Sequence, residues 1–172
     1  MDLAAHQRAL YELIHADSSA EHLSDSYLRK VAASDGLRVV RDILAHWQAF
    51  DVRRSCPLTA RALGHLGQFE QVVREVPFAT ADAYLDSRSR LFLDHVARRG
   101  GMIGSVARFE RALIDVRRGE RQPRTVEWDR DPTPIINGLL EGRWLAALAK
   151  RGRYQTVIDP SLAELVRIDL VK

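Results

Sequence analysis

Residues 101–119 read GMIGSVARFERALIDVRRG, and this segment determines how the rest of the chain is interpreted. Its apolar side chains recur at steps of four, three, four and three residues, at Met102, Val106, Phe109, Leu113 and Val116. That spacing predicts a helix with one apolar face toward a core and with charged side chains on its other face. Gly119 follows Arg117 and Arg118, and this order predicts the helix C-terminus, which favours cations and a left-handed residue.

Helical patterns precede this helix, whereas short alternating runs follow it. Residues 125–129, 154–158 and 165–171 have the alternation of half-buried strands. We therefore predict a mainly α protein, in which an N-terminal helical bundle (residues 1–119) is followed by a small α+β part (residues 120–172) with a three-stranded antiparallel sheet. The two parts are predicted to be separate domains.

The longest helix of the first part is predicted to start after an N-cap at Ser34 and to run to about Val52. Pro57 ends it and begins the next helix. Trp47 and Phe50 lie on its apolar face, so they are predicted to be core anchors first and interface anchors second. A shorter amphipathic helix is expected near the N-terminus, whereas residues 24–33 have no clear period.

The second part also contains two short apolar segments that suggest helices. They cover residues 135–140 and 144–149, and Gly142 separates them. We expect both to be short helices that lie between the first and the second strand.

Composition indicates a globular protein. The chain has 172 residues, 46% of them hydrophobic, with a formal net charge of +3. No apolar run approaches the roughly 18 residues of a membrane span, and the first residues do not resemble a signal peptide. We therefore expect a soluble, cytoplasmic protein without a membrane partner.

The sequence shows no self-sufficient active site. The six histidines lie on different segments and never at the spacing of a metal-binding helix, and no phosphate-binding or dinucleotide-binding glycine motif is present. Cys56, the only cysteine, precedes a proline at a helix start. The alternatives for Cys56 are a small buried residue and, less favoured, a reactive thiol. No catalytic, cofactor-binding or metal-binding residue is predicted in this chain.

Arginines gather on and beside the helix of residues 101–119, at Arg98, Arg99, Arg108, Arg111, Arg117, Arg118, Arg121 and Arg124. A solvated helix face explains this cluster without a partner. The alternative function that the cluster suggests is a sequence-nonspecific DNA-binding helical module, although no recognition-helix pattern accompanies it. An independent hydrolase or thiol enzyme is a third possibility.

Four short motifs occur in a definite order: CPL at 56–58, GQFEQVV at 67–73, LFLDHV at 91–96 and ARFERAL at 107–113. This order resembles the helical family whose members are encoded beside TIM-barrel multinuclear iron oxygenases. Within that family, the strands after Gly119 and the segment from Trp47 to Pro57 resemble the small partner subunit of the methanobactin biosynthesis enzyme.

The resemblance implies that this chain is a non-catalytic partner subunit. Such subunits bind a TIM-barrel subunit that holds the iron, and their C-terminal sheet receives the leader of a ribosomally made precursor peptide. The implied reaction is the dioxygen-dependent oxidation of peptide cysteine to an oxazolone and an adjacent thioamide. The chain itself is expected to hold no cofactor, and nucleic acid is not an expected partner.

The last strand is the predicted peptide-binding element. Its residues are Val166, Arg167, Ile168, Asp169 and Leu170. The apolar members of this strand are expected to face the helices while Arg167 and Asp169 point outward, so that an extended peptide can be added at its edge. The strand of residues 125–129 is the alternative edge.

Overall fold

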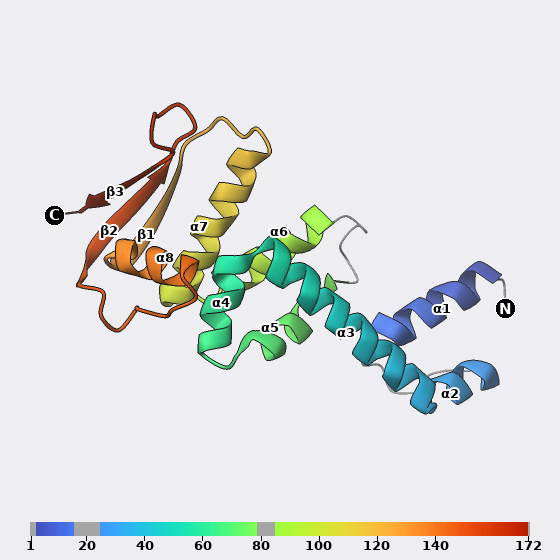
Figure 1. Cartoon of the computed structure of the whole chain (residues 1–172). Helices are drawn as coiled ribbons and strands as arrows, with labels where there is room; N and C mark the ends of the chain where they lie inside the picture. Colours follow the sequence, from blue (N-terminus) through green and yellow to red (C-terminus); the bar gives the residue numbers. More distant parts are fainter. Residues whose placement is uncertain (1–2, 16–24, 79–84, 172) are drawn as a thin grey trace.

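The computed structural model describes residues 3–15, 25–78 and 85–171. It confirms a mainly α protein whose helices are followed by a small three-stranded antiparallel sheet (Figure 1). The helices are α1 (Leu3–His15), α2 (Ser26–Ala32), α3 (Asp35–Ser55), α4 (Pro57–His65), α5 (Phe69–Glu75), α6 (Leu85–Ala97), α7 (Gly101–Arg117) and α8 (Pro132–Leu140). The strands are β1 (Arg124–Arg130), β2 (Arg151–Ile158) and β3 (Val166–Leu170).

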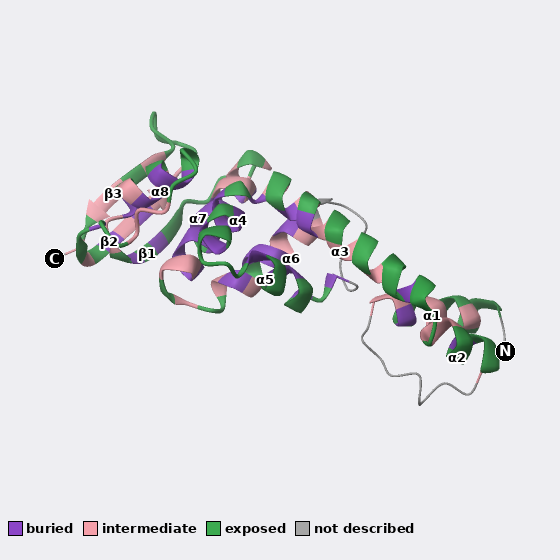
Figure 2. Ribbon diagram, turned by 60° about the horizontal axis from the view of Figure 1, so that its bottom comes forward, coloured by how far each residue is buried: buried purple, intermediate pink, exposed green. Residues whose placement is uncertain are grey.

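The shape is elongated, with the sheet at one end and α1 and α2 at the other (Figure 1). Between the ends, α3 runs from the α1–α2 corner to the main body (Figure 2). None of the helices in the described part of the chain is long and apolar enough to cross a membrane.

A small apolar cluster holds the N-terminal corner together. Leu13 of α1, Leu28 of α2 and Leu37 of α3 are its fully covered members. The helix α2 forms in the segment without a clear period because the Asp25 carboxylate accepts hydrogen bonds from two amides of its first turn, and because Leu28 is buried. The cap and the buried Leu28 therefore stabilise this helix although its sequence has no clear apolar periodicity.

The helix α3 starts where predicted and extends three residues past the predicted end at about Val52. The Ser34 hydroxyl caps its first turn, and it ends at Ser55, before Pro57. Its core-facing side carries Leu37, Ala49 and Val52, however, whereas Trp47 and Phe50 are 57% and 49% exposed. The prediction that these two aromatic residues anchor the core is wrong, because α3 has apolar residues on two sides and only one side is covered.

The helix α7 is covered on more than one side, so it joins two cores. Ala107 packs in the core of α3 to α6, whereas Val106 and Phe109 pack in the core beneath the sheet. Part of the predicted charged face is buried too, since Glu110 and Asp115 are 4% and 7% exposed, whereas Arg108 and Arg117 are exposed. The two parts predicted on either side of residue 119 thus share side chains of α7.

Glu110 completes the N-terminus of α4. Its two carboxylate oxygens accept hydrogen bonds from the Leu58 and Thr59 amides, each at 2.8 Å. No side-chain cap comes from Cys56, so the amides that a helix N-terminus leaves unpaired find their acceptor on α7 instead. Burial raises the pKa of the Glu110 carboxyl, and the hydrogen bonds from both amides oppose that rise.

The sheet has the order β1-β2-β3, and both neighbouring pairs are antiparallel. The face that carries Val126, Trp128 and Ile158 is buried against α7 and α8. On this face the Trp128 indole donates a hydrogen bond to the Thr156 hydroxyl, which satisfies both buried polar groups. The helix α8 ends as predicted at Leu140, but it begins at Pro132, three residues before the predicted segment, with Asp131 as its N-cap.

Residues 144–149 do not form the predicted helix. Gly142 has a φ of +77°, which reverses the chain after α8, and the Arg143 amide then bonds to the Gly138 carbonyl at 2.7 Å. The following chain makes only short turns, as in the 3.0 Å bond from the Leu148 amide to the Leu145 carbonyl. A β-carbon on Gly138 would lie 2.9 Å from Leu145 Cγ, so the close approach of this segment to α8 depends on that glycine.

Candidate functional site: the open edge of the sheet

The strand β3 is an edge of the sheet, and no other described strand pairs with its outer side. The Val171 amide donates to the Arg153 carbonyl at 2.8 Å, and the Asp159 amide donates to the Leu165 carbonyl at 2.9 Å. Hydrogen-bonded and non-hydrogen-bonded residue pairs alternate along an antiparallel pair of strands. The backbone groups of Arg167 and Asp169 therefore also form hydrogen bonds with β2. The main-chain groups of the residues between them, Val166, Ile168 and Leu170, therefore point to the open side.

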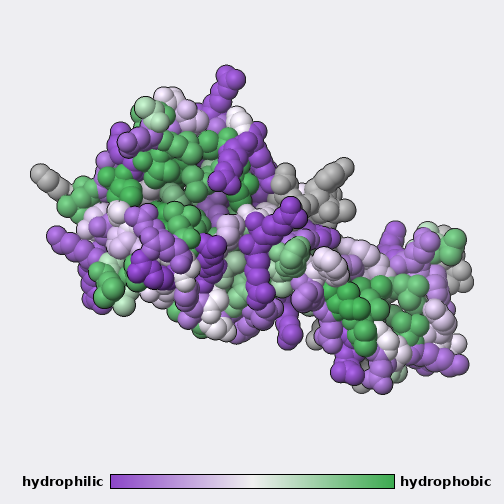
Figure 3. Space-filling model, viewed as in Figure 1, coloured by the Kyte–Doolittle hydropathy of each residue, from purple (hydrophilic) through white to green (hydrophobic). Residues whose placement is uncertain are grey.

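An apolar pocket lies beside this open edge. It encloses about 330 Å³ and combines side chains of four elements, namely Leu58 (α4), Phe109 and Leu113 (α7), Thr133, Ile136, Asn137 and Leu140 (α8), and Val166 and Ile168 (β3). Figure 3 shows the apolar surface on the face where the sheet meets α7 and α8. An unpaired strand and an adjacent apolar pocket are the two features that a strand-adding peptide requires.

The side chains of β3 divide between the two faces of the sheet. Val166 and Ile168 pack against the core on the side of the helices, as predicted. Leu170 lies on the same face by register, but it is 62% exposed. Arg167 and Asp169 occupy the opposite face, where their side chains form an exposed ion pair at 3.0 Å.

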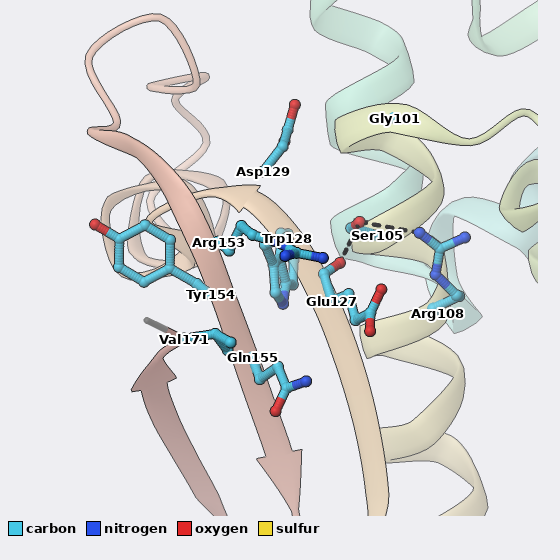
Figure 4. Close-up of a pocket in the computed structure, with 10 residues that line it drawn as sticks. All are labelled: Gly101, Ser105, Arg108, Glu127, Trp128, Asp129, Arg153, Tyr154, Gln155 and Val171. Carbon is cyan, nitrogen blue, oxygen red and sulfur yellow. Dashed lines mark hydrogen bonds between the residues drawn. The ribbon is translucent and has the colours of Figure 1, made fainter.

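The other edge of the sheet, β1, lies against α7. The Ser105 hydroxyl donates to the outward Glu127 carbonyl at 2.7 Å, and the Arg108 guanidinium donates to that hydroxyl at 3.1 Å. A polar cavity of about 410 Å³ continues from this edge onto the solvent face of the sheet, toward Arg153 and Gln155 (Figure 4). The alternative edge is thus partly occupied by groups of the chain itself.

Cys56 does not have the surroundings of a nucleophile. It is fully buried, and burial together with the nearby Glu110 carboxylate raises the pKa of its thiol to about 12. Its sulfur lies 3.6 Å from the Ser55 hydroxyl and 3.9 Å from the Ser89 carbonyl oxygen. The prediction that Cys56 is a small buried residue is confirmed, and its burial and raised thiol pKa both disfavour the alternative of a reactive thiol.

Acidic side chains accompany many of the arginines near α7. Arg111 bridges Asp94 and Asp115 at 2.6 Å and 3.1 Å, and Arg90 also reaches Asp115, at 3.1 Å. Farther along, Arg99 pairs with Glu75, and Arg124 pairs with Glu120 at 3.1 Å. These pairs reduce the positive charge that the cluster presents to a phosphate backbone.

The pocket beside β3 was missed by sequence reasoning, although its strand was identified. Its walls come from segments as distant as Leu58 and Ile168, and each wall residue has only the ordinary pattern of a core position. The leucine at the rim, Leu140, is 62% exposed, and only the folded structure reveals this exposure.

Comparisons of this chain with protein-family models, curated proteins and solved structures found no match. Among the residues that the structure describes, no group of three or more His, Cys, Asp or Glu side chains could hold a metal ion.

Proposed function

We propose that this chain is a non-catalytic partner subunit that binds an iron-dependent TIM-barrel oxygenase and presents a ribosomally made precursor peptide to it. The leader of the peptide is held as an added strand along β3. The oxygenase then oxidises a cysteine of the peptide to an oxazolone and an adjacent thioamide. The iron belongs to the partner subunit.

The observation that carries this proposal is the open edge of β3 beside an apolar pocket. Three residues of β3 direct their main-chain groups outward, which suits the backbone of an extended peptide. Side chains of an added strand alternate between the two faces, so every second side chain can enter the apolar pocket. The backbone bonds supply affinity for a strand, and the pocket selects an apolar residue in it.

The position of the edge also suits presentation to a second protein. The sheet lies at one end of the elongated chain, away from α1 and α2 (Figure 1). A peptide added there leaves its unpaired residues free to extend beyond this chain. The resemblance to oxygenase partner subunits supplies the identity of the proposed second protein.

The proposal is tested with a fluorescein-labelled precursor peptide encoded beside the oxygenase gene. Its anisotropy is measured as the purified chain is added, for the wild type and for Ile168→Pro and Ile168→Ala. Ile168 directs its amide to the open side, so proline removes no main-chain bond to β2; it removes the outward donor and the packed Ile168 side chain. We expect Ile168→Pro to weaken binding by about tenfold or more.

Ile168→Ala is the matched control, because it also shortens the packed side chain and yet keeps the amide. Its binding should lie between that of the wild type and that of Ile168→Pro. Circular dichroism checks that both variants fold. Equal binding by folded Ile168→Pro and wild type would mean that the peptide does not dock along β3.

A second experiment tests the oxygenase. Co-expression of this chain, the barrel subunit and the precursor should yield a co-purifying complex and a peptide whose cysteine is modified, as read by mass spectrometry. Omission of this chain should abolish the modification. A barrel subunit that modifies the peptide equally well alone would contradict the proposed role.

A further inference from the structure

The outward side of α3 carries an apolar stripe that no other helix or strand of the described residues covers. Its members are Val39, Val40, Ile43, Trp47 and Phe50, which are 52%, 44%, 53%, 57% and 49% exposed. They recur at the helical steps of a single face, opposite the core-facing Ala49 and Val52. The green outer surface of α3 in Figure 2 shows that this helix is exposed along much of its length.

This stripe differs from scattered exposed apolar residues. Its side chains adjoin one another over about three turns, and the Trp47 and Phe50 rings meet edge to face with centroids 5.9 Å apart. A continuous apolar face with aromatic residues is typical of an interaction surface.

The sizes of the side chains suit an antiparallel pairing of the stripe with a copy of itself. Its N-terminal half carries the smaller β-branched residues Val39, Val40 and Ile43, whereas its C-terminal half carries the large Trp47 and Phe50. When two such helices meet antiparallel, the large half of each lies opposite the small half of the other. Interdigitation of large and small side chains is what close packing requires.

The charges at the two ends of the stripe are complementary in the same arrangement. Asp35 precedes Val39 by four residues, and Arg54 follows Phe50 by four residues. An antiparallel copy therefore brings each Asp35 near an Arg54 of the other chain. The Asp35 side chain is 94% exposed although Arg38 lies 3.5 Å away, so it remains accessible to a second cation.

We propose that α3 binds a second copy of this chain, stripe to stripe and antiparallel, about a two-fold axis near the middle of the stripe. The interface is isologous, so each contact occurs twice. The helix α3 lies away from β3 in Figure 1, so the β3 edges of both chains stay open in such a dimer. This inference is independent of the proposed peptide binding.

The size of the stripe sets the expected affinity. From Val39 to Phe50 the helix rises about 17 Å, at about 1.5 Å per residue. One helix pair of this length covers less than the roughly 800 Å² per partner of a standard stable interface. We therefore expect a dissociation constant on the order of 1–100 µM.

Sedimentation equilibrium of the full chain from about 1 to 500 µM, a range that brackets this constant, tests the proposal. The wild type should pass from monomer to dimer in this range. Ile43→Glu places a charge at the centre of the stripe and should raise the dissociation constant by about 20-fold or more. Leu148→Glu is the matched control, because Leu148 is 80% exposed and lies outside the stripe, and it should leave dimerisation unchanged.

A charge exchange tests the antiparallel direction. Asp35→Arg and Arg54→Asp should each weaken the dimer by about threefold to tenfold, because each places like charges together twice per dimer. The variant with both substitutions restores opposite charges and should dimerise within about threefold of the wild type. Circular dichroism checks that all variants remain folded.

Three results would overturn the proposal. The first is a wild-type chain that remains monomeric at the highest concentration, which would leave the stripe to a different protein such as the oxygenase subunit. The second is a dimer that Ile43→Glu does not weaken. The third is the absence of rescue in the double charge variant, which would exclude the antiparallel pairing.

Discussion

The two edges of the sheet differ in what lies beside them. Along β1, the Ser105 hydroxyl of α7 occupies the outward Glu127 carbonyl at 2.7 Å. Along β3, the outward groups of Val166, Ile168 and Leu170 meet no other described strand, and an apolar pocket adjoins them. An unpaired edge exposes a protein to aggregation, and natural proteins cover or interrupt such edges. The sheet follows this rule at one edge only, and the other edge, β3, is the one that we propose as the peptide-binding edge.

The open edge still carries features that limit indiscriminate pairing. β3 has only five residues, and its solvent face presents the Arg167–Asp169 ion pair. Short length and charge both disfavour edge-to-edge association. The strand is therefore suited to a specific peptide.

The largest expected effect is on stability, and it distinguishes the amides of β3 that bond to β2 from those that point outward. Asp169→Pro removes an amide that bonds to β2, whereas Ile168→Pro removes one that points outward. We expect Asp169→Pro to lower the free energy of unfolding by about 3 kcal/mol or more, measured by urea denaturation. Ile168→Pro should cost clearly less, and equal losses would show that the outward direction of Ile168 is incorrectly assigned.

The next effect concerns the apolar pocket beside β3. Leu140→Asp adds a charge at the rim of the pocket and should weaken precursor-peptide binding by about tenfold. Leu148→Asp makes the same chemical change at an exposed leucine outside the pocket. Anisotropy titrations compare the two variants, and similar binding by both would remove the pocket from the site.

A smaller effect is expected at the covered edge. Ser105→Ala leaves the Glu127 carbonyl without its hydroxyl donor and should lower the free energy of unfolding by about 1 kcal/mol. Peptide affinity should not change, because the proposed peptide site lies along β3 at the opposite edge. Ser161→Ala, at an exposed turn, controls for the loss of a hydroxyl in the unfolding measurement. A large gain of peptide binding in Ser105→Ala would indicate that β1 is also a usable edge.

The smallest effect is expected from Arg167→Ala. The Arg167–Asp169 pair is solvent-exposed, so its loss should change the free energy of unfolding by less than about 0.5 kcal/mol. Peptides with an acidic residue opposite Arg167 should lose more affinity than neutral peptides. A panel of peptides that differ in one charge measures this selectivity, and a uniform change across the panel would contradict it.

The secondary structure could largely be predicted from local patterns. The cap at Ser34, the break before Pro57 and the alternation in the three strands each depend on a few neighbouring residues. Residues 144–149 were misassigned as a helix because their apolar pattern does not reveal the close contact of Leu145 with Gly138. That contact is tertiary.

The candidate site could be predicted only in part, for the same reason. Alternation identified β3 as a strand, but the order of strands and the pocket arise from contacts between distant segments. The periodicity of α3 likewise showed that Trp47 lies on an apolar face, and it carried no information on whether another element covers that face.

The Glu110 cap has a consequence for synthesis of the chain. The acceptor that completes the first turn of α4 lies 52 residues beyond Leu58 in the sequence. At about 5–20 residues per second, the ribosome adds that acceptor several seconds after it has made the start of α4. Until then the first turn of α4 lacks its native acceptor, so the completion of this helix is coupled to the arrival of α7. During translation, α4 therefore acquires its native N-terminal acceptor only after α7 has been synthesised.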